Sequence, residues 1–298
     1  MSHVHPQTPR HTGHGTGHGT GPGHDSPHDT DGQAEILDLD AEVLAEHIDA
    51  ITRWLPVTAV PGRIVDLGCG TGAGTFALLD RFPEAHVTAV DTSAGHLRRL
   101  RDKARARGVE GRVRTVQADL DDADWPDLGT PDLVWASASM HHMAHPDRTL
   151  RTVRDLLAPG GLFAVVELSG FPRFLPETAP EDRPGLEERC HEASDRYHAE
   201  HVSHRGADWG PKLTEAGFLL AGERTVTVNI EGSHGSAVGA YALGSMKRMR
   251  GSVTDALQAE DLAALDRLLD TESPHSILRR GDLVVRTERS VWAARRAD

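Results

Sequence analysis

Cysteine and long apolar runs are what this sequence has least of. Its 298 residues include two cysteines, Cys69 and Cys190, and Cys69 lies inside a glycine-rich segment, so we expect a reducing compartment and no structural disulfide. No apolar run reaches the roughly 18 residues that span a membrane. The N-terminus also lacks the apolar core of a signal peptide. These absences predict a soluble, cytoplasmic protein with no membrane partner.

Basic and aromatic residues are also in short supply. The chain has 32 Lys and Arg against 45 Asp and Glu, which gives a formal net charge of −13. Because phosphate backbones are bound by basic surfaces, this balance argues against a nucleic-acid partner. Aromatic residues make up 4% of the chain, which leaves few side chains to stack on a planar substrate. We expect a small-molecule substrate, and a homodimer is a possible assembly.

Residues 1–33 contain almost no apolar side chains, so the entropy lost on ordering would not be offset and a disordered tail is expected. Seven of the 19 histidines lie there, around a loose Thr-Gly-His-Gly repeat: His3, His5, His11, His14, His18, His24 and His28. Imidazole is a common metal ligand, but the spacing is irregular and no cysteine assists. An inert tail is therefore favoured over a metal site. Residues 33–54 then show helical periodicity, which suits either a lid or a helix packed on a sheet.

The strongest motif is an acid followed by glycines at alternate positions: Asp66, Gly68, Gly70 and Gly72. It follows a short apolar strand, residues 63–67, and precedes a helix. Glycines let a ligand approach the backbone closely, and the helix start offers free N–H groups. The pattern predicts a nucleotide-like ligand. The dinucleotide fingerprint G-x-G-x-x-G differs from it, although its tolerant form ends on Ala73, so NAD stays open.

A second predicted strand, residues 86–90, ends at Asp91 and Thr92. A carboxylate there can accept hydrogen bonds from both ribose hydroxyls of a nucleoside. NAD and other nucleoside cofactors both predict this acid. The alternative is that Asp91 caps the next helix, although Ser93 can serve as that cap.

Together with three later motifs, the chain resembles the class I S-adenosylmethionine (SAM) dependent methyltransferases of the small-molecule type. The later motifs are Asp119-Leu120 after a strand at 113–116, a His-containing turn at 138–143 after a strand at 132–137, and Pro159-Gly160-Gly161 before a strand at 162–168. An acidic run that follows, Asp121, Asp122 and Asp124, reads as a solvated loop rather than a cation site.

The resemblance implies a role for each motif. Asp66, Gly68, Gly70, Gly72, Asp91 and Thr92 would bind SAM. Asp119 would contact the adenine amino group, the backbone of Leu120 a ring nitrogen, and Ser137 the amino-acid portion. His141 or His142 would face the acceptor and take a proton from it, since imidazole titrates near neutral pH. The other histidine would be structural, and the residues do not tell which.

The long segment 169–210 is expected to be a lid over the acceptor pocket, because connections of this length usually have a function or their own structure. Arg173, Arg183 and Tyr197 are its candidate substrate contacts. His191, His198 and His201 fall on one face of its predicted helix, and a polar helix face is favoured there over a metal site.

Alternating strands and helices predict a seven-stranded, doubly wound, Rossmann-like α/β methyltransferase sheet with a helical lid insertion. The expected domain runs over 34–298, and its last strand, 283–292, is antiparallel in the family. The expected activity is methyl transfer from SAM to an O, N or C atom of a small molecule, with secondary metabolism as one setting. Three alternatives stay open: a non-catalytic SAM-binding protein, an NAD-dependent oxidoreductase, and a protein or nucleic-acid methyltransferase.

Overall fold

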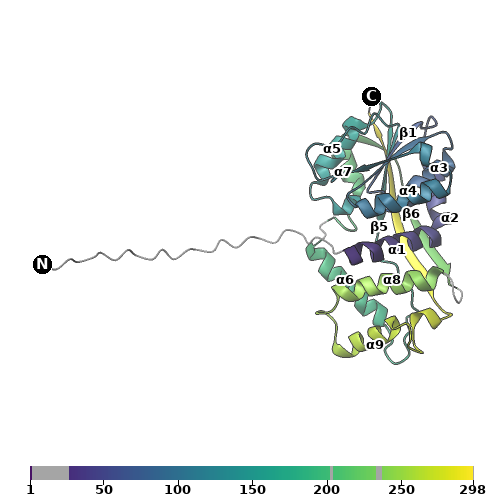
Figure 1. Cartoon of the computed structure of the whole chain (residues 1–298), viewed down its shortest axis with the longest axis vertical. Helices are drawn as coiled ribbons and strands as arrows, with labels where there is room; N and C mark the ends of the chain where they lie inside the picture. Colours follow the sequence, from purple (N-terminus) through teal and green to yellow (C-terminus); the bar gives the residue numbers. More distant parts are fainter. Residues whose placement is uncertain (2–26, 202–203, 233–236, 298) are drawn as a thin grey trace.

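The computed structural model describes residue 1 and residues 27–201, 204–232 and 237–297, so most of the predicted N-terminal tail lies outside the described residues. One mixed sheet of seven strands runs through the molecule in the order β3-β2-β1-β4-β5-β7-β6 (Figure 1). The strands are β1 (Arg63–Leu67), β2 (His86–Asp91), β3 (Val113–Gln117), β4 (Leu133–Ser137), β5 (Leu162–Leu168), β6 (Phe218–Glu231) and β7 (Val284–Arg296). β7 is antiparallel to both neighbours, β5 and β6, and the other pairs are parallel, as expected.

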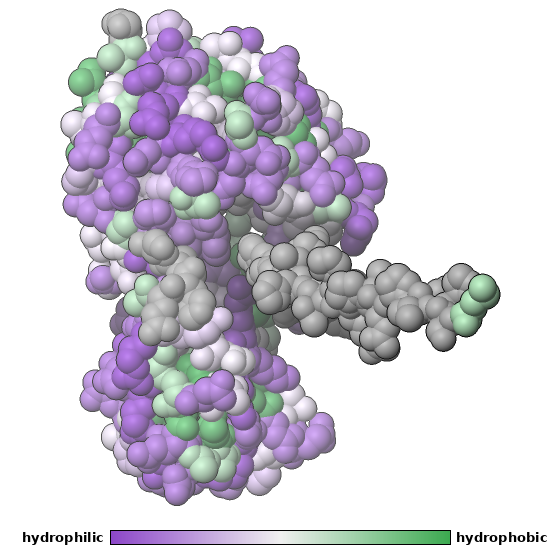
Figure 2. Space-filling model, turned by 90° about the vertical axis from the view of Figure 1, so that its left-hand side faces the viewer, coloured by the Kyte–Doolittle hydropathy of each residue, from purple (hydrophilic) through white to green (hydrophobic). Residues whose placement is uncertain are grey.

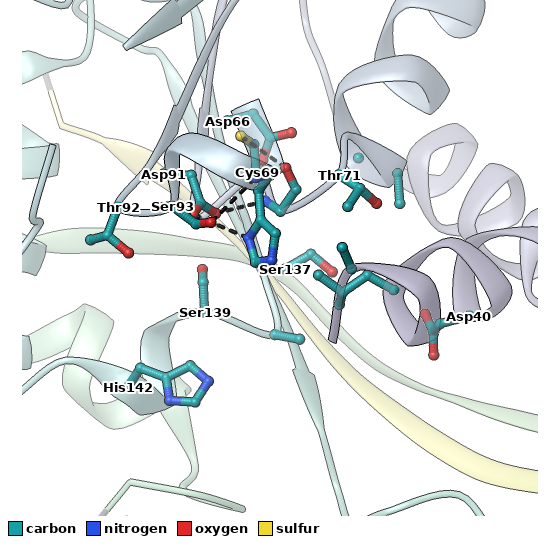
Figure 3. Close-up of a pocket in the computed structure, with 18 of the residues that line it drawn as sticks. Asp40, Asp66, Cys69, Thr71, Asp91, Thr92, Ser93, Ser137, Ser139 and His142 are labelled. Carbon is teal, nitrogen blue, oxygen red and sulfur yellow. Dashed lines mark hydrogen bonds and ion pairs between the residues drawn. The ribbon is translucent and has the colours of Figure 1, made fainter. Parts of the chain in front are cut away.

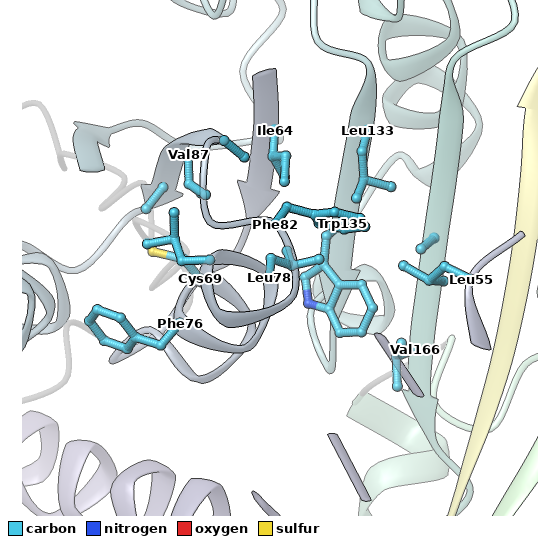
Figure 4. Close-up of a cluster of buried hydrophobic side chains, with 14 of the residues drawn as sticks. Leu55, Ile64, Cys69, Phe76, Leu78, Phe82, Val87, Leu133, Trp135 and Val166 are labelled. Atoms are coloured by element: carbon cyan, nitrogen blue, oxygen red, sulfur yellow. The ribbon is translucent and has the colours of Figure 1, made fainter. Parts of the chain in front are cut away.

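Helices cover both faces of the sheet. α2 (Ala45–Trp54), α3 (Ala73–Arg81) and α4 (Ala94–Ala106) pack on one face, where Ile64 of β1 and Trp135 of β4 join the core (Figure 4). α5 (Pro146–Leu156) and α7 (Trp209–Glu215) pack on the other face, against Val65 and Leu67. Successive residues of β1 thus face opposite cores, as strand geometry requires.

Three further helices lie in the lower part of Figure 1, and each contributes buried side chains to a third core. We call α6 (Leu186–His201), α8 (Ala237–Ser252) and α9 (Ala259–Leu269) the helical cap. Its interior includes Phe174, Leu186, Tyr241, Met246 and Leu265. Short 3-10 turns lie at η1 (Glu110–Arg112), η2 (Met140–His142) and η3 (Ile277–Arg279).

The N-terminal helix differs from the expectation. α1 (Pro27–Val43) begins six residues earlier than predicted, with proline at its first position, where the missing N–H costs nothing. The predicted continuous helix is divided at Leu44, whose φ of −97° and ψ of 10° are not helical and whose side chain is buried. α1 packs mainly against α8 and α2 mainly against α3, so the two helices differ in their main partner.

The segment 169–210 is also organised differently from the expectation. Its helix, α6, shares a core with α8 and α9, so the layer is assembled from separate stretches of the chain. His191 is buried in it rather than part of a polar face.

The outer surface is mainly hydrophilic, with apolar residues gathered on the lower part of the view in Figure 2. Among the described residues, no helix has the length and apolar character needed to cross a membrane.

Candidate active site

One large cavity opens at the carboxyl ends of the central strands. It measures about 1110 Å³ and lies between β1, β2 and β4 on one side and α1, α2 and α4 on the other. This volume lies just above the range of about 300–1,000 Å³ that is usual for a pocket holding one drug-sized ligand. Most of the predicted site residues line it: Asp66, Gly68, Gly70, Asp91, Thr92, Asp119, Leu120, Ser137 and His142.

Two glycines of the turn after β1 are needed for the backbone they adopt. Gly68 has a φ of +66°, and a Cβ there would lie 2.4 Å from the Cβ of Ser139. Gly72 has a φ of +99° and precedes α3. Gly72 does not line the cavity, so its predicted contact with a ligand is not supported. Its part is to start the helix in a conformation that other residues rarely adopt.

Asp91 is the polar centre of the cavity wall (Figure 3). One carboxylate oxygen accepts the backbone N–H of Gly70 at 2.9 Å. The other accepts the N–H of Ser93 at 2.8 Å and lies 3.3 Å from Nδ1 of His96. A carboxylate offers about four lone pairs, so about one remains for a ligand. The helix cap is Ser93, whose hydroxyl accepts from the N–H of His96. The alternative that Asp91 caps α4 is therefore not supported.

Asp66 lies deeper and is almost fully buried. The hydroxyl of Thr75 donates to its carboxylate at 2.6 Å. Burial raises the pKa of Asp66 to about 7, and the negative charge of Asp91 adds to the shift, while the Thr75 hydrogen bond opposes it. Near neutral pH, Asp66 is therefore partly protonated, which avoids a second full charge beside Asp91.

The raised pKa of Asp66 predicts a pH-dependent stability. The folded protein holds this proton between pH 3.8 and about 7 and the unfolded chain does not, so stability falls as pH rises through that window and is level above it. We expect Asp66→Asn to remove this slope, which amounts to about 4 kcal/mol over the whole window. Urea unfolding of both proteins from pH 5 to 8 measures it. A constant difference between the two across this range would contradict the assignment.

Asp119 and Leu120, which are predicted to contact SAM, line another part of the cavity. Leu120 is buried, whereas Asp119 is exposed and accepts the N–H of Asp121 at 2.9 Å. Asp121 accepts backbone N–H groups of Ala144 and His145, so it orders the loop after β4. Within the described ranges, no three potential ligands come together as a metal site.

The two adjacent histidines take different positions. His141 is buried and does not line the cavity; its Nδ1 lies 2.6 Å from Oε2 of Glu167 on β5. His142 lines the cavity and its ring surface remains exposed there, with the two ring centroids 4.1 Å apart. Surrounding protein atoms remove water from the His142 ring, and this desolvation lowers its pKa to about 4. The neighbouring His141 adds to the shift. At neutral pH His142 is thus an uncharged imidazole facing the cavity, and His141 is held by Glu167.

The candidate substrate contacts of segment 169–210 do not reach this cavity. Arg173 pairs with Glu188 of its own segment, and Arg183 with the buried Asp261. Tyr197 is 44% exposed on α6. Arg173 and Arg183 precede α6, whose side chains pack in the helical cap, so contact of these three residues with a substrate stays a prediction.

Several cavity residues were not anticipated, and they come from distant parts of the chain: Asp40, Leu44, Ile48, Val166, Val228 and Arg289. Nη2 of Arg289 donates to Oδ1 of Asp40 at 2.7 Å, and the hydroxyl of Tyr241 donates to the same oxygen. A signal for Arg289 existed in the sequence. On β7 it shares a face with the buried Val285 and Val291, so a cation interrupts an inward-facing row.

Comparisons with known proteins address the region of the donor motifs. Residues 64–161 match the family profile described as a methyltransferase domain. A trans-aconitate 2-methyltransferase of Acidovorax sp. (strain JS42) is 42% identical over 105 residues, 35% of this chain and 38% of the relative. A malonyl-[acyl-carrier protein] O-methyltransferase of Halorhodospira halophila is 33% identical over 195 residues, 63% of this chain and 59% of the relative. The chain thus spans well under two thirds of each.

Solved structures extend the likeness of the fold. A proposed methyltransferase of Bacillus halodurans C-125 superposes with a TM-score of 0.54 at 17% identity, over 85% of this chain and all of that one. The YcgJ protein of Bacillus subtilis gives 0.50 at 16% identity, over 85% and 99%. The predicted seven-stranded α/β fold class is confirmed, whereas the lid insertion stays a prediction. Residues 64–161 thus match a methyltransferase domain, and the chain is similar in fold to these two solved structures.

Proposed function

We propose that this protein transfers the methyl group of SAM to an oxygen, nitrogen or carbon atom of a small molecule. The observation that carries the proposal is one cavity lined both by the donor motifs and by elements outside them. Asp66, Asp91, Asp119 and Ser137 belong to the matched methyltransferase segment. Asp40 and Arg289 lie outside it and line the same cavity.

The residues present fit the donor. Gly68 brings bare backbone to the cavity wall, and the spare lone pair on Asp91 suits a ribose hydroxyl. We assign Asp119 and Leu120 to the adenine and Ser137 to the amino-acid portion. When bound, SAM supplies the activated methyl group, so the protein has to bind, orient and exclude water. Alignment of two reactants can lower a barrier by about 7–11 kcal/mol at best.

His142 is proposed as the residue that faces the acceptor. A base with a pKa of about 4 is weak, so its contribution belongs at the lower end of general-base catalysis. We expect His142→Ala to lower the single-turnover methyl-transfer rate about 100-fold while S-adenosylhomocysteine (SAH) still binds. The rate of the unmodified protein should show no inflection near pH 6.5, because His142 is already neutral there. His145→Ala, on the same loop but outside the cavity, is the control. An unchanged rate in His142→Ala would remove the base assignment.

Two of the alternative functions left open by the sequence are an NAD-dependent oxidoreductase and a non-catalytic SAM-binding protein. An NAD-dependent oxidoreductase is set aside, because the matched segment belongs to methyltransferases. A non-catalytic SAM-binding protein keeps every donor residue and is separated by experiment. A panel of small acids, phenols and amines with methyl-labelled SAM should yield a labelled product. Tight SAH binding with no product across the panel would favour the non-catalytic protein.

Our proposal for the setting of the reaction is a cytoplasmic enzyme without nucleic-acid partners, whose domain runs from residue 27 rather than 34 to residue 298. A homodimer remains part of the proposal. Light scattering of the purified protein and fractionation of the cells that make it test these points.

A further inference from the structure

We propose that the methyl acceptor carries a carboxylate group, which Arg289 binds, on an apolar body held between α1–α2 and the sheet. The inference rests on the proposed function, because it concerns the acceptor half of the same cavity.

Arg289 is placed where an acceptor would lie. It pairs with Leu168 at the carboxyl end of β5 and with Val226 of β6, beyond the donor strands. Apolar side chains surround this part of the cavity: Leu44, Ile48, Ile51, Val166 and Val228. Arg289 is 8% exposed, yet it lines the cavity. A guanidinium among apolar groups therefore faces the space left for the second molecule.

The Arg289 guanidinium is held in a fixed orientation and has N–H groups that are still available to a ligand. Within the described part of the chain, its side-chain hydrogen bond is the one from Nη2 to Oδ1 of Asp40. Tyr241 donates to the same oxygen and anchors Asp40 from the helical cap. A guanidinium has five N–H groups, so most remain for a ligand. Arg289 is already ion-paired with Asp40, and a bound carboxylate would accept from the N–H groups that this ion pair leaves unused.

The charges nearby favour a carboxylate over other charged groups. The planar guanidinium matches a carboxylate with two parallel hydrogen bonds. A doubly charged phosphate would meet the negative charge of Asp40. An ammonium would meet Arg289, and near His142 also the positive charges of Arg205 and Arg248, which already disfavour a protonated imidazole. A ligand with one negative charge and an apolar body would therefore complement Arg289 and the apolar side chains around it.

Calorimetry on the SAH-saturated protein tests the inference with three probes of equal chain length: octanoate, octanamide and octylamine. We expect octanoate to bind at least about 10-fold more tightly than octanamide, in line with a charge-assisted pair replacing a neutral one. Arg289→Gln should remove that preference, and Arg289→Lys should retain part of it. Arg224→Gln is the matched control. Arg224 is on β6, next to the strand of Arg289, and its guanidinium lies over the ring of Trp54, outside the cavity.

SAH binding by each variant shows that the donor half is still folded. Equal binding of octanoate and octanamide would overturn the inference and leave the proposed function standing. Preference for octylamine would also overturn it, because Asp40 would then be the recognising group. An unchanged preference for octanoate in Arg289→Gln would do the same. Absence of SAH binding by the unmodified protein would overturn the proposed function itself.

Discussion

Replacing Asp91 by alanine should weaken SAH binding about 100-fold, the largest effect expected of any single side chain in the cavity. The variant loses a ligand contact and also the carboxylate that holds the N–H groups of Gly70 and Ser93. Two half-buried N–H groups would then lack their acceptor, and the glycine turn would lose its fixed position. Isothermal calorimetry with SAH measures the loss.

The control variants show whether the loss of SAH binding is specific to the Asp91 carboxylate. Asp80→Ala removes an exposed acid that pairs with Arg107 and should leave binding unchanged. His96→Ala removes one neighbour of Asp91 and keeps the carboxylate, so most of the affinity should persist. Asp91→Asn should weaken SAH binding as much as Asp91→Ala, because the NH2 of its amide would face a backbone N–H group. A less than 3-fold loss in Asp91→Ala would contradict the assignment, since a charge-assisted hydrogen bond is worth more.

Replacing Gly68 by alanine should destabilise the protein by about 2–4 kcal/mol, from a left-handed backbone and from overpacking together. The added methyl group would lie 2.4 Å from the Cβ of Ser139 in a buried turn. Urea unfolding gives the loss of free energy, and SAH binding should fall with it because the turn forms the cavity wall.

Gly108 provides a matched control for this effect. It has the same φ of +66°, but a Cβ there would have nothing within 4 Å. Gly108→Ala should therefore show the backbone cost alone, about 1–2 kcal/mol. Ser139→Gly in the Gly68→Ala background removes the clashing atom and should restore part of the stability. Equal losses in Gly68→Ala and Gly108→Ala would show that the contact with Ser139 is unimportant.

The donor half of the cavity was readable from sequence because its motifs are local. Each one follows a strand, and parallel strands bring their carboxyl ends to one edge of the sheet. Asp66, Asp91 and Ser137 therefore meet although they are spread over 72 positions, from 66 to 137. Strand order and direction follow the same general rules of α/β folds.

The acceptor half was not readable, because it depends on which distant segments pack together. Asp40 and Arg289 are 249 positions apart and meet only because β7 inserts between β5 and β6 under α1. The choice between His141 and His142 depended on Glu167, 26 positions away on β5. The positions of the predicted lid contacts depend on distant packing in the same way: Tyr197 lies on α6, which joins the helical cap, and Arg173 is bridged to Arg286 of β7.

The most direct test of the central claim is the binding of SAH and NAD to the unmodified protein, measured side by side by calorimetry. We expect SAH to bind in the micromolar range and NAD not to bind. Binding of NAD without SAH would leave the fold intact and contradict the methyltransferase assignment. Binding of neither would contradict the donor site built around Asp91.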